Sequence, residues 1–188
     1  SPYTSCDAID DAGFLLQSGF GFDGADLENP NVYYGENVPF VMGDLCHYNN
    51  PIYAQTNEGK LQSVPLTVTV EGIKCDDGSD PIGGTTTSFT YNLRLDETTN
   101  TNIPLEDCPY PSTISCSDGV FISQPPPGQV FTCNYGTSTV TYTIVTLGFM
   151  QEDSEGNCPA WNAALAKRDF ISEEGQTNCA CMYGMIAD

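Results

Sequence analysis

Residues 88–95 read SFTYNLRL, and this stretch decides the fold class. Its apolar side chains all fall on one side of an extended chain: Phe89, Tyr91, Leu93 and Leu95. Residues 138–147, STVTYTIVTL, repeat the pattern, with threonine alternating with Val140, Tyr142 and Ile144. Alternation with a period of two is typical of β-strands that bury one face.

Shorter candidate strands surround these two, separated by Gly, Pro, Asn and Asp. They are residues 38–45, 62–70, 120–123, 129–134 and 179–186. Short strands at regular spacing predict an all-β protein, an antiparallel β-sandwich that is Ig-like or jelly-roll-like. We expect at most one short helix, within residues 159–167 (PAWNAALAK). We divide the chain into an N-terminal arm, residues 1–22, and a sandwich domain, residues 23–188.

The chain is strongly acidic. Among 188 residues, 25 are Asp or Glu and 5 are Lys or Arg, which gives a net charge of -20. Phosphate contacts need a cationic surface, so we expect no nucleic-acid partner. No apolar run approaches the roughly 18 residues of a membrane span.

The cysteines indicate an oxidising compartment. There are 9, spread along the chain: Cys6, Cys46, Cys75, Cys108, Cys116, Cys133, Cys158, Cys179 and Cys181. Without the paired spacing of a zinc site, a disulfide framework is the leading interpretation, and it places the protein outside the cytoplasm. The best local pair is Cys108 with Cys116, and the second is Cys158 with Cys179 or Cys181. Because the number is odd, at least one thiol is free or pairs between chains.

Residues 13–22, GFLLQSGFGF, form a distinctive N-terminal segment. Its strand would carry four large apolar side chains on one face: Phe14, Leu16, Phe20 and Phe22. One interpretation makes it the first strand of the sandwich. The other makes it a strand donated to a neighbouring subunit by β-augmentation, with Gly19 and Gly21 allowing close approach.

The sequence offers no catalytic constellation, and we expect no enzyme. In GDLCHYNNPI, Cys46 and His47 are neighbours on a strand and point to opposite faces, so we expect a disulfide at Cys46 and a hydrogen-bonded His47. Two acidic loops could hold calcium, although neither matches an EF-hand. The candidate ligands are Asp76, Asp77 and Asp80 in CDDGSD, and Asp23 and Asp26, with Glu28, in GFDGADLE. O-glycosylation is possible at residues 85–88 and 98–101, which are rich in threonine.

Two motifs resemble a known family. PFVMGDLCHYNNPI, followed by a Thr/Val strand, resembles the G-x-x-T-H-x-N-x-P-I region of the THxN and choice-of-anchor K families, and the C-terminal FISEEGQTNCACMYGMI is similar to their closing pattern. The resemblance spans roughly residues 32–186, and Cys46 stands where the family has Thr. It implies an exported, surface-displayed β-rich domain without catalytic residues to carry over. His47, Asn49 and Glu174 match as motif positions only.

Two functions remain open. The first is a structural subunit of an extracellular filament or surface appendage, a homopolymer held together by strand contacts between copies. The second is a secreted adhesion or glycan-binding module that uses calcium. Both place the protein outside the cell or at its surface, where we expect a mature chain, without leader or anchor, that is free or held by other subunits.

Overall fold

The structure is a computed structural model, and it describes residues 19–26, 37–49, 63–98, 103–122, 128–167 and 169–187. The strands in these ranges are β1 Gly19–Gly24, β2 Pro39–Asn49, β3 Ser63–Val70, β4 Thr87–Asp96, β5 Asp118–Ile122, β6 Gln129–Tyr135, β7 Ser138–Gln151, β8 Asp169–Ser172 and β9 Gln176–Ala187. The one described helical element is η1, a 3₁₀ turn over Leu105–Asp107.

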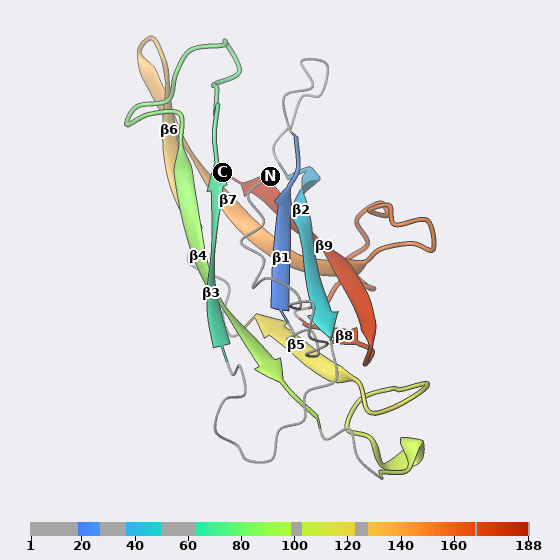
Figure 1. The fold of residues 1–188 in the computed structure, drawn as a ribbon. Helices are drawn as coiled ribbons and strands as arrows, with labels where there is room; N and C mark the ends of the chain where they lie inside the picture. The colour runs from blue at the N-terminus through green and yellow to red at the C-terminus, as the bar shows by residue number, and fades with distance from the viewer. Residues whose placement is uncertain are drawn as a thin grey trace.

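The strands form two antiparallel sheets (Figure 1). The first has the order β1-β2-β9-β7-β6, and the second has the order β3-β4-β5-β8. Side chains from both sheets meet in one hydrophobic core. The prediction of a disulfide-bonded antiparallel β-sandwich is therefore confirmed.

Strand β4 has the predicted alternation in full. Phe89, Tyr91, Leu93 and Leu95 are all buried, and the residues between them are exposed. On the outer face, hydroxyl groups pair across strands, as in Thr67 with Thr90 at 3.1 Å. One face thus supplies the core, while the other keeps the sheet in contact with water.

Two longer strands contain bulges that the sequence did not reveal. The β2–β9 register shifts between Val41 and Gly43, and the β7–β9 register shifts between Thr146 and Gly148. A bulge exchanges the two faces of a strand. In β2 the core side chains are therefore Phe40 and Met42 before the shift, and Leu45, His47 and Asn49 after it.

The sequence predicted at most one short helix, and residues 159–167, its expected place, form none. They make a short turn instead, in which Trp161 packs on Tyr183 with ring centroids 5.1 Å apart. The Tyr183 hydroxyl also donates a hydrogen bond to the Pro159 carbonyl. A segment this short is a marginal helix without an amphipathic face to bury, so its aromatic anchor decides the conformation.

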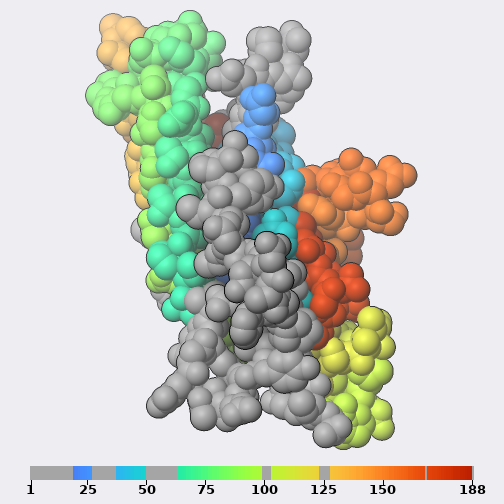
Figure 2. Space-filling model, viewed as in Figure 1, coloured from blue at the N-terminus to red at the C-terminus, as the bar shows by residue number. Residues whose placement is uncertain are grey.

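The described residues form an elongated body (Figure 2). The β6–β7 hairpin lies at one end, and the loop that contains η1 lies at the other (Figure 1). Residues 152–167 project from the side formed by β7 and β9. Within these ranges no helix is long and apolar enough to cross a membrane.

Candidate assembly site at the edge strand β1

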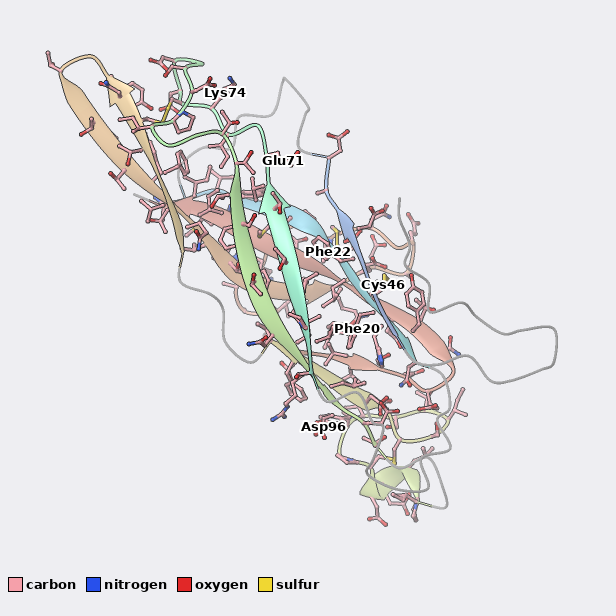
Figure 3. All side chains as sticks on the ribbon, turned by 60° about the vertical axis from the view of Figure 1, so that its left-hand side comes forward. Phe20, Phe22, Cys46, Glu71, Lys74 and Asp96 are labelled. Atoms are coloured by element: carbon pink, nitrogen blue, oxygen red, sulfur yellow. A yellow bond between two sulfur atoms is a disulfide. The ribbon has the colours of Figure 1, made fainter. Side chains whose placement is uncertain are left out.

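Strand β1 lies at the edge of the five-stranded sheet and pairs with β2. Phe20 and Phe22 point from β1 toward the space between the sheets (Figure 3). Both are half-buried and pack against the core. The predicted apolar face of this strand is therefore found at Phe20 and Phe22, while Phe14 and Leu16 lie outside the described residues.

Glycine at position 43 allows β1 to lie against β2. A Cβ atom at Gly43 would stand 2.4 Å from the Asp23 carbonyl oxygen and 2.6 Å from the Phe22 ring. Those distances are far inside van der Waals contact, so any side chain here would displace β1. At Gly24, the residue opposite Gly43, a Cβ atom would meet nothing within 4 Å.

His47 is fully buried beneath β1. Its ring stacks on Phe20 with centroids 4.8 Å apart, and among the described residues neither ring nitrogen has a hydrogen-bond partner. Burial lowers the pKa of His47 from 6.5 to about 4, so the ring is neutral at pH 7. The hydrogen bond expected for His47 is not seen in this part of the chain.

The two motifs behind the family resemblance lie side by side, because β2 pairs with β9. His47 stands opposite Asn178, and Cys46 stands opposite Cys179, to which it is bonded. The Asn49 side chain donates a hydrogen bond to the Ser172 carbonyl at 3.1 Å. The Asn49 backbone carbonyl accepts one from the Gly175 amide at 2.7 Å.

The Asn178 side chain, opposite His47, fixes the turn between β8 and β9. Asn178 Oδ1 accepts a hydrogen bond from the Glu173 amide at 2.7 Å and lies 3.3 Å from Ser172 Oγ. Glu174 is also buried, at 8% exposed. These residues anchor the turn to β2, and the arrangement supplies no nucleophile with a base beside it.

An acidic cluster occupies the outer face of the β1–β2 pair. Asp23 lies directly opposite Asp44, and burial, followed by the charge of Asp23, raises the pKa of the Asp44 carboxyl. The pKa of Glu152 is raised by burial and then by Asp44 and Asp153. Like charges placed directly across two strands oppose the pairing of β1 with β2.

Asp44, Cys158 and Cys181 come close together but form no metal site. Asp44 Oδ1 lies 3.0 Å from Cys158 Sγ, and Cys181 Sγ is close by. Cys158 and Cys181 are bonded to each other, so neither sulfur is a thiolate ligand. The contact is also no hydrogen bond, because a disulfide sulfur carries no hydrogen.

The predicted calcium ligands do not converge within the described ranges. Asp77 accepts hydrogen bonds from the amide and the hydroxyl of Ser79, which lower its pKa, and Asp80 pairs with Lys74. Asp77, Asp80, Asp76 and Asp26 belong to no group of three possible metal ligands among the described residues. Glu28 lies outside the described residues. Calcium binding stays a prediction without support from this geometry.

Four disulfides account for eight cysteines. The pairs are Cys46–Cys179, Cys75–Cys133, Cys108–Cys116 and Cys158–Cys181. Both local predictions are confirmed, with Cys181 as the partner of Cys158. Cys6, the ninth cysteine of the sequence, lies outside the described residues and takes part in none of these four bonds.

Comparison of the chain with models of protein families and with curated proteins gave no match. The resemblance to the THxN and choice-of-anchor K families therefore stays a prediction.

Proposed function

We propose that this protein is a structural subunit of an extracellular filament or surface appendage, in which β1 of one copy pairs with β2 of the next. The observation that carries the proposal is the position of β1. It is the first described strand, it lies at a sheet edge, and it contributes Phe20 and Phe22 to a core that the rest of the chain builds.

Exchange of β1 between copies costs little in contacts. The β1–β2 ladder of a single chain and the same ladder between two chains have the same hydrogen bonds and the same stacking on His47. Their free energies then differ mainly through chain entropy and protein concentration, as in other domain swaps. Residues 13–18, with Phe14 and Leu16, would extend the donated strand.

The other sheet edges are less suited to pairing in the described part of the chain. Pro65 in β3 lacks a backbone N–H group and interrupts a ladder at that edge. At the edge formed by β6, Ile82 already bridges to Thr132. Strand β8 is only 4 residues long.

The proposed contact is head-to-tail, because the donated strand and the accepting edge are different surfaces. Such contacts propagate into filaments unless the rotation between copies closes a ring. The four disulfides fit an oxidising compartment outside the cytoplasm, and we place the filament at or beyond the cell surface.

Matched glycine variants test the proposal. In Gly43→Ala the new methyl group collides with β1, whereas in Gly24→Ala it points into open space. By negative-stain microscopy, we expect filaments from the wild type and from Gly24→Ala, and none from Gly43→Ala. Disulfide mapping and circular dichroism confirm that both variants fold.

A second measurement separates exchange from pairing within one chain. Phe22 is replaced by the photocrosslinker benzoylphenylalanine, and ¹⁴N- and ¹⁵N-labelled chains are mixed before assembly. Crosslinked peptides that combine the two isotopes are expected. Crosslinks of one isotope only, in filaments of mixed chains, would refute strand exchange.

A further inference from the structure

Cys46 and Cys179 form a disulfide directly across the β2–β9 ladder. Their Cα atoms lie 4.0 Å apart. This separation is shorter than the 4.4–6.8 Å usual for disulfides and shorter than the about 4.5 Å of the narrow pair in an antiparallel ladder. The ladder continues on both sides, through Leu45 with Ala180 and His47 with Asn178. The strands therefore stay paired whether or not the sulfur atoms are bonded.

This disulfide is also the one pair, of the four described, in which neither cysteine is buried. Cys133 and Cys181 are 0% exposed, and Cys116 is 2% exposed, so each of the other bonds has a sulfur enclosed by protein. Cys46 and Cys179 are both half-buried. Cys108 and Cys158 give their bonds one sulfur each that is not fully buried, whereas Cys46–Cys179 offers an attacking thiolate two.

The neighbourhoods of the partly exposed disulfides differ. Cys46 belongs to the outer face of β2, and the β1 residue opposite it is Gly21, beside which the Tyr48 ring lies on the same face. The Cys158–Cys181 bond differs, because the Asp44 carboxylate lies 3.0 Å from Cys158 Sγ. An approaching thiolate is repelled there by a like charge.

From this geometry we propose that Cys46–Cys179 is a site of thiol–disulfide exchange, which accepts an attacking thiolate while the sandwich stays folded. The thiolate forms a bond to one of the two sulfurs, the Cys46–Cys179 bond breaks, and the other sulfur leaves as a thiolate that solvent protonates. With a dithiol, the second thiol displaces the first protein sulfur, so that the reagent is oxidised and both cysteines are reduced.

The chemical class of the ligand is a thiol. It can come from a small molecule or from the Cys6 side chain of a second copy, since Cys6 takes part in none of the four described bonds. The proposal rests on the disulfide alone, and it holds whether or not β1 is exchanged between copies.

The test uses the native full-length protein and dithiothreitol, a dithiol that attacks as its thiolate. Samples are quenched over time with iodoacetamide, and the alkylated peptides are quantified by mass spectrometry. We expect Cys46 and Cys179 to be alkylated at least about tenfold faster than Cys108 and Cys116. The Cys108–Cys116 bond is the internal control, because it lies in an exposed loop but has one buried sulfur and a Cα separation of 5.2 Å.

The far-UV circular dichroism spectrum is expected to stay unchanged while Cys46 and Cys179 react. The proposal is overturned if another bond opens first or if all four bonds open together with loss of the spectrum. The Cys46→Ala, Cys179→Ala double variant must lack the fast phase of dithiothreitol consumption, and a fast phase that persists contradicts the assignment.

A second arm identifies the source of the thiol. Wild-type protein is concentrated without reagent and run on a non-reducing gel beside Cys6→Ser. A dimer of the wild type alone, whose linking peptides join Cys6 to Cys46 or Cys179, identifies a second copy as the source. Reaction with dithiothreitol but no such dimer identifies small-molecule thiols.

Discussion

At pH 7 the His47 ring is neutral, because burial lowers its pKa from 6.5 to about 4. The unfolded chain takes up a proton near pH 6.5, whereas the folded chain takes it up only near pH 4. The stability that the neutral ring contributes is therefore complete above pH 6.5 and is lost as the pH falls toward 4. The chain has a single histidine, so no other imidazole contributes in this range.

We predict that His47→Phe removes this acid sensitivity. The variant keeps an aromatic ring against Phe20 but cannot be protonated. Between pH 6.5 and pH 4 the wild type should lose about 3 kcal/mol of unfolding free energy that the variant retains. Urea denaturation of both proteins at several pH values measures the difference. If the unfolding free energy changed with pH to the same extent in both proteins, the role of His47 would be contradicted.

The contribution of Asp44 to stability changes with pH in the opposite direction to that of His47. Burial and Asp23 raise the pKa of its carboxyl in the folded state, so the charged form opposes folding at neutral pH and this penalty disappears as the pH falls. We expect Asp44→Asn to stabilise the protein at pH 7 by about 0.2–1 kcal/mol, and to have little effect at acidic pH.

Asp77→Asn is the control for this change. Hydrogen bonds from Ser79 lower the pKa of Asp77, so its charge is accommodated in the folded state. Thermal unfolding at pH 7 should show that Asp44→Asn raises the unfolding midpoint and that Asp77→Asn does not raise it. Equal shifts would mean that only net charge matters.

At the scale of the strand, β1 differs from β2 and β9 in the number of strands that pair with it. Among the described strands β1 pairs only with β2, whereas β2 and β9 each have two neighbours. An edge strand opens locally at a smaller free energy than the central strands. By hydrogen exchange of the monomer, amides of residues 19–24 are expected to exchange before those of β2 and β9.

The same measurement on Gly43→Ala should show still faster exchange in β1, with β9 unchanged. Gly24→Ala should match the wild type, because its methyl group meets nothing. Protection of β1 equal to that of β9 would contradict an edge strand that is free to exchange.

The strands also show what a sequence can predict. Residues 88–95 were predicted in full, because β4 is straight and one face is buried throughout. The bulges between Val41 and Gly43 and between Thr146 and Gly148 were missed, because each depends on the partner strand and leaves no mark in local alternation. Strand β8 was missed because 4 residues are too few to display a period.

The site was predictable to a similar degree. Phe20 and Phe22 follow from alternation alone. The stacking of Phe20 on His47 and the closeness of Gly43 to Asp23 depend on the β1–β2 register, which the sequence does not specify. In the same way Cys108–Cys116 closes a loop of 8 residues and was predicted, whereas Cys46–Cys179 spans 133 and was not.

At the scale of the whole molecule, the disulfides connect distant parts of the chain. Cys75–Cys133 ties the loop after β3 to β6, and Cys46–Cys179 joins β2 to β9. Such links restrict the unfolded chain and contribute about 2–4 kcal/mol each. They also leave Cys6 as the odd thiol.

We predict that Cys6 alone reacts when monomeric protein is denatured and alkylated without a reductant. Peptide mapping by mass spectrometry reads the modified cysteine directly. Alkylation at any of the other eight positions would show that the corresponding disulfide is absent. Loss of Cys6 reactivity in assembled material, restored by reduction, would show that Cys6 links copies covalently.

The net charge of -20 determines how copies approach each other. Repulsion between them extends over the Debye length, which is about 30 Å at 0.01 M salt and about 8 Å at 0.15 M. Contacts through Phe20 and Phe22 act only at short range, so salt should favour assembly. We predict that the lowest concentration at which filaments form falls as sodium chloride rises from about 0.01 to about 0.15 M. Sedimentation of filaments measures it.

Two comparisons make the salt prediction specific. Asp44→Asn removes one of two like charges that face each other across β1 and β2, so its assembly should depend less on salt than that of the wild type. Calcium chloride and sodium chloride at equal ionic strength should act equally if screening alone operates. A much larger effect of calcium would instead support an ion bound by the acidic loops. Assembly that weakens as salt rises would mean that charge attraction between copies outweighs their repulsion, and the strand contact would then not be what drives them together.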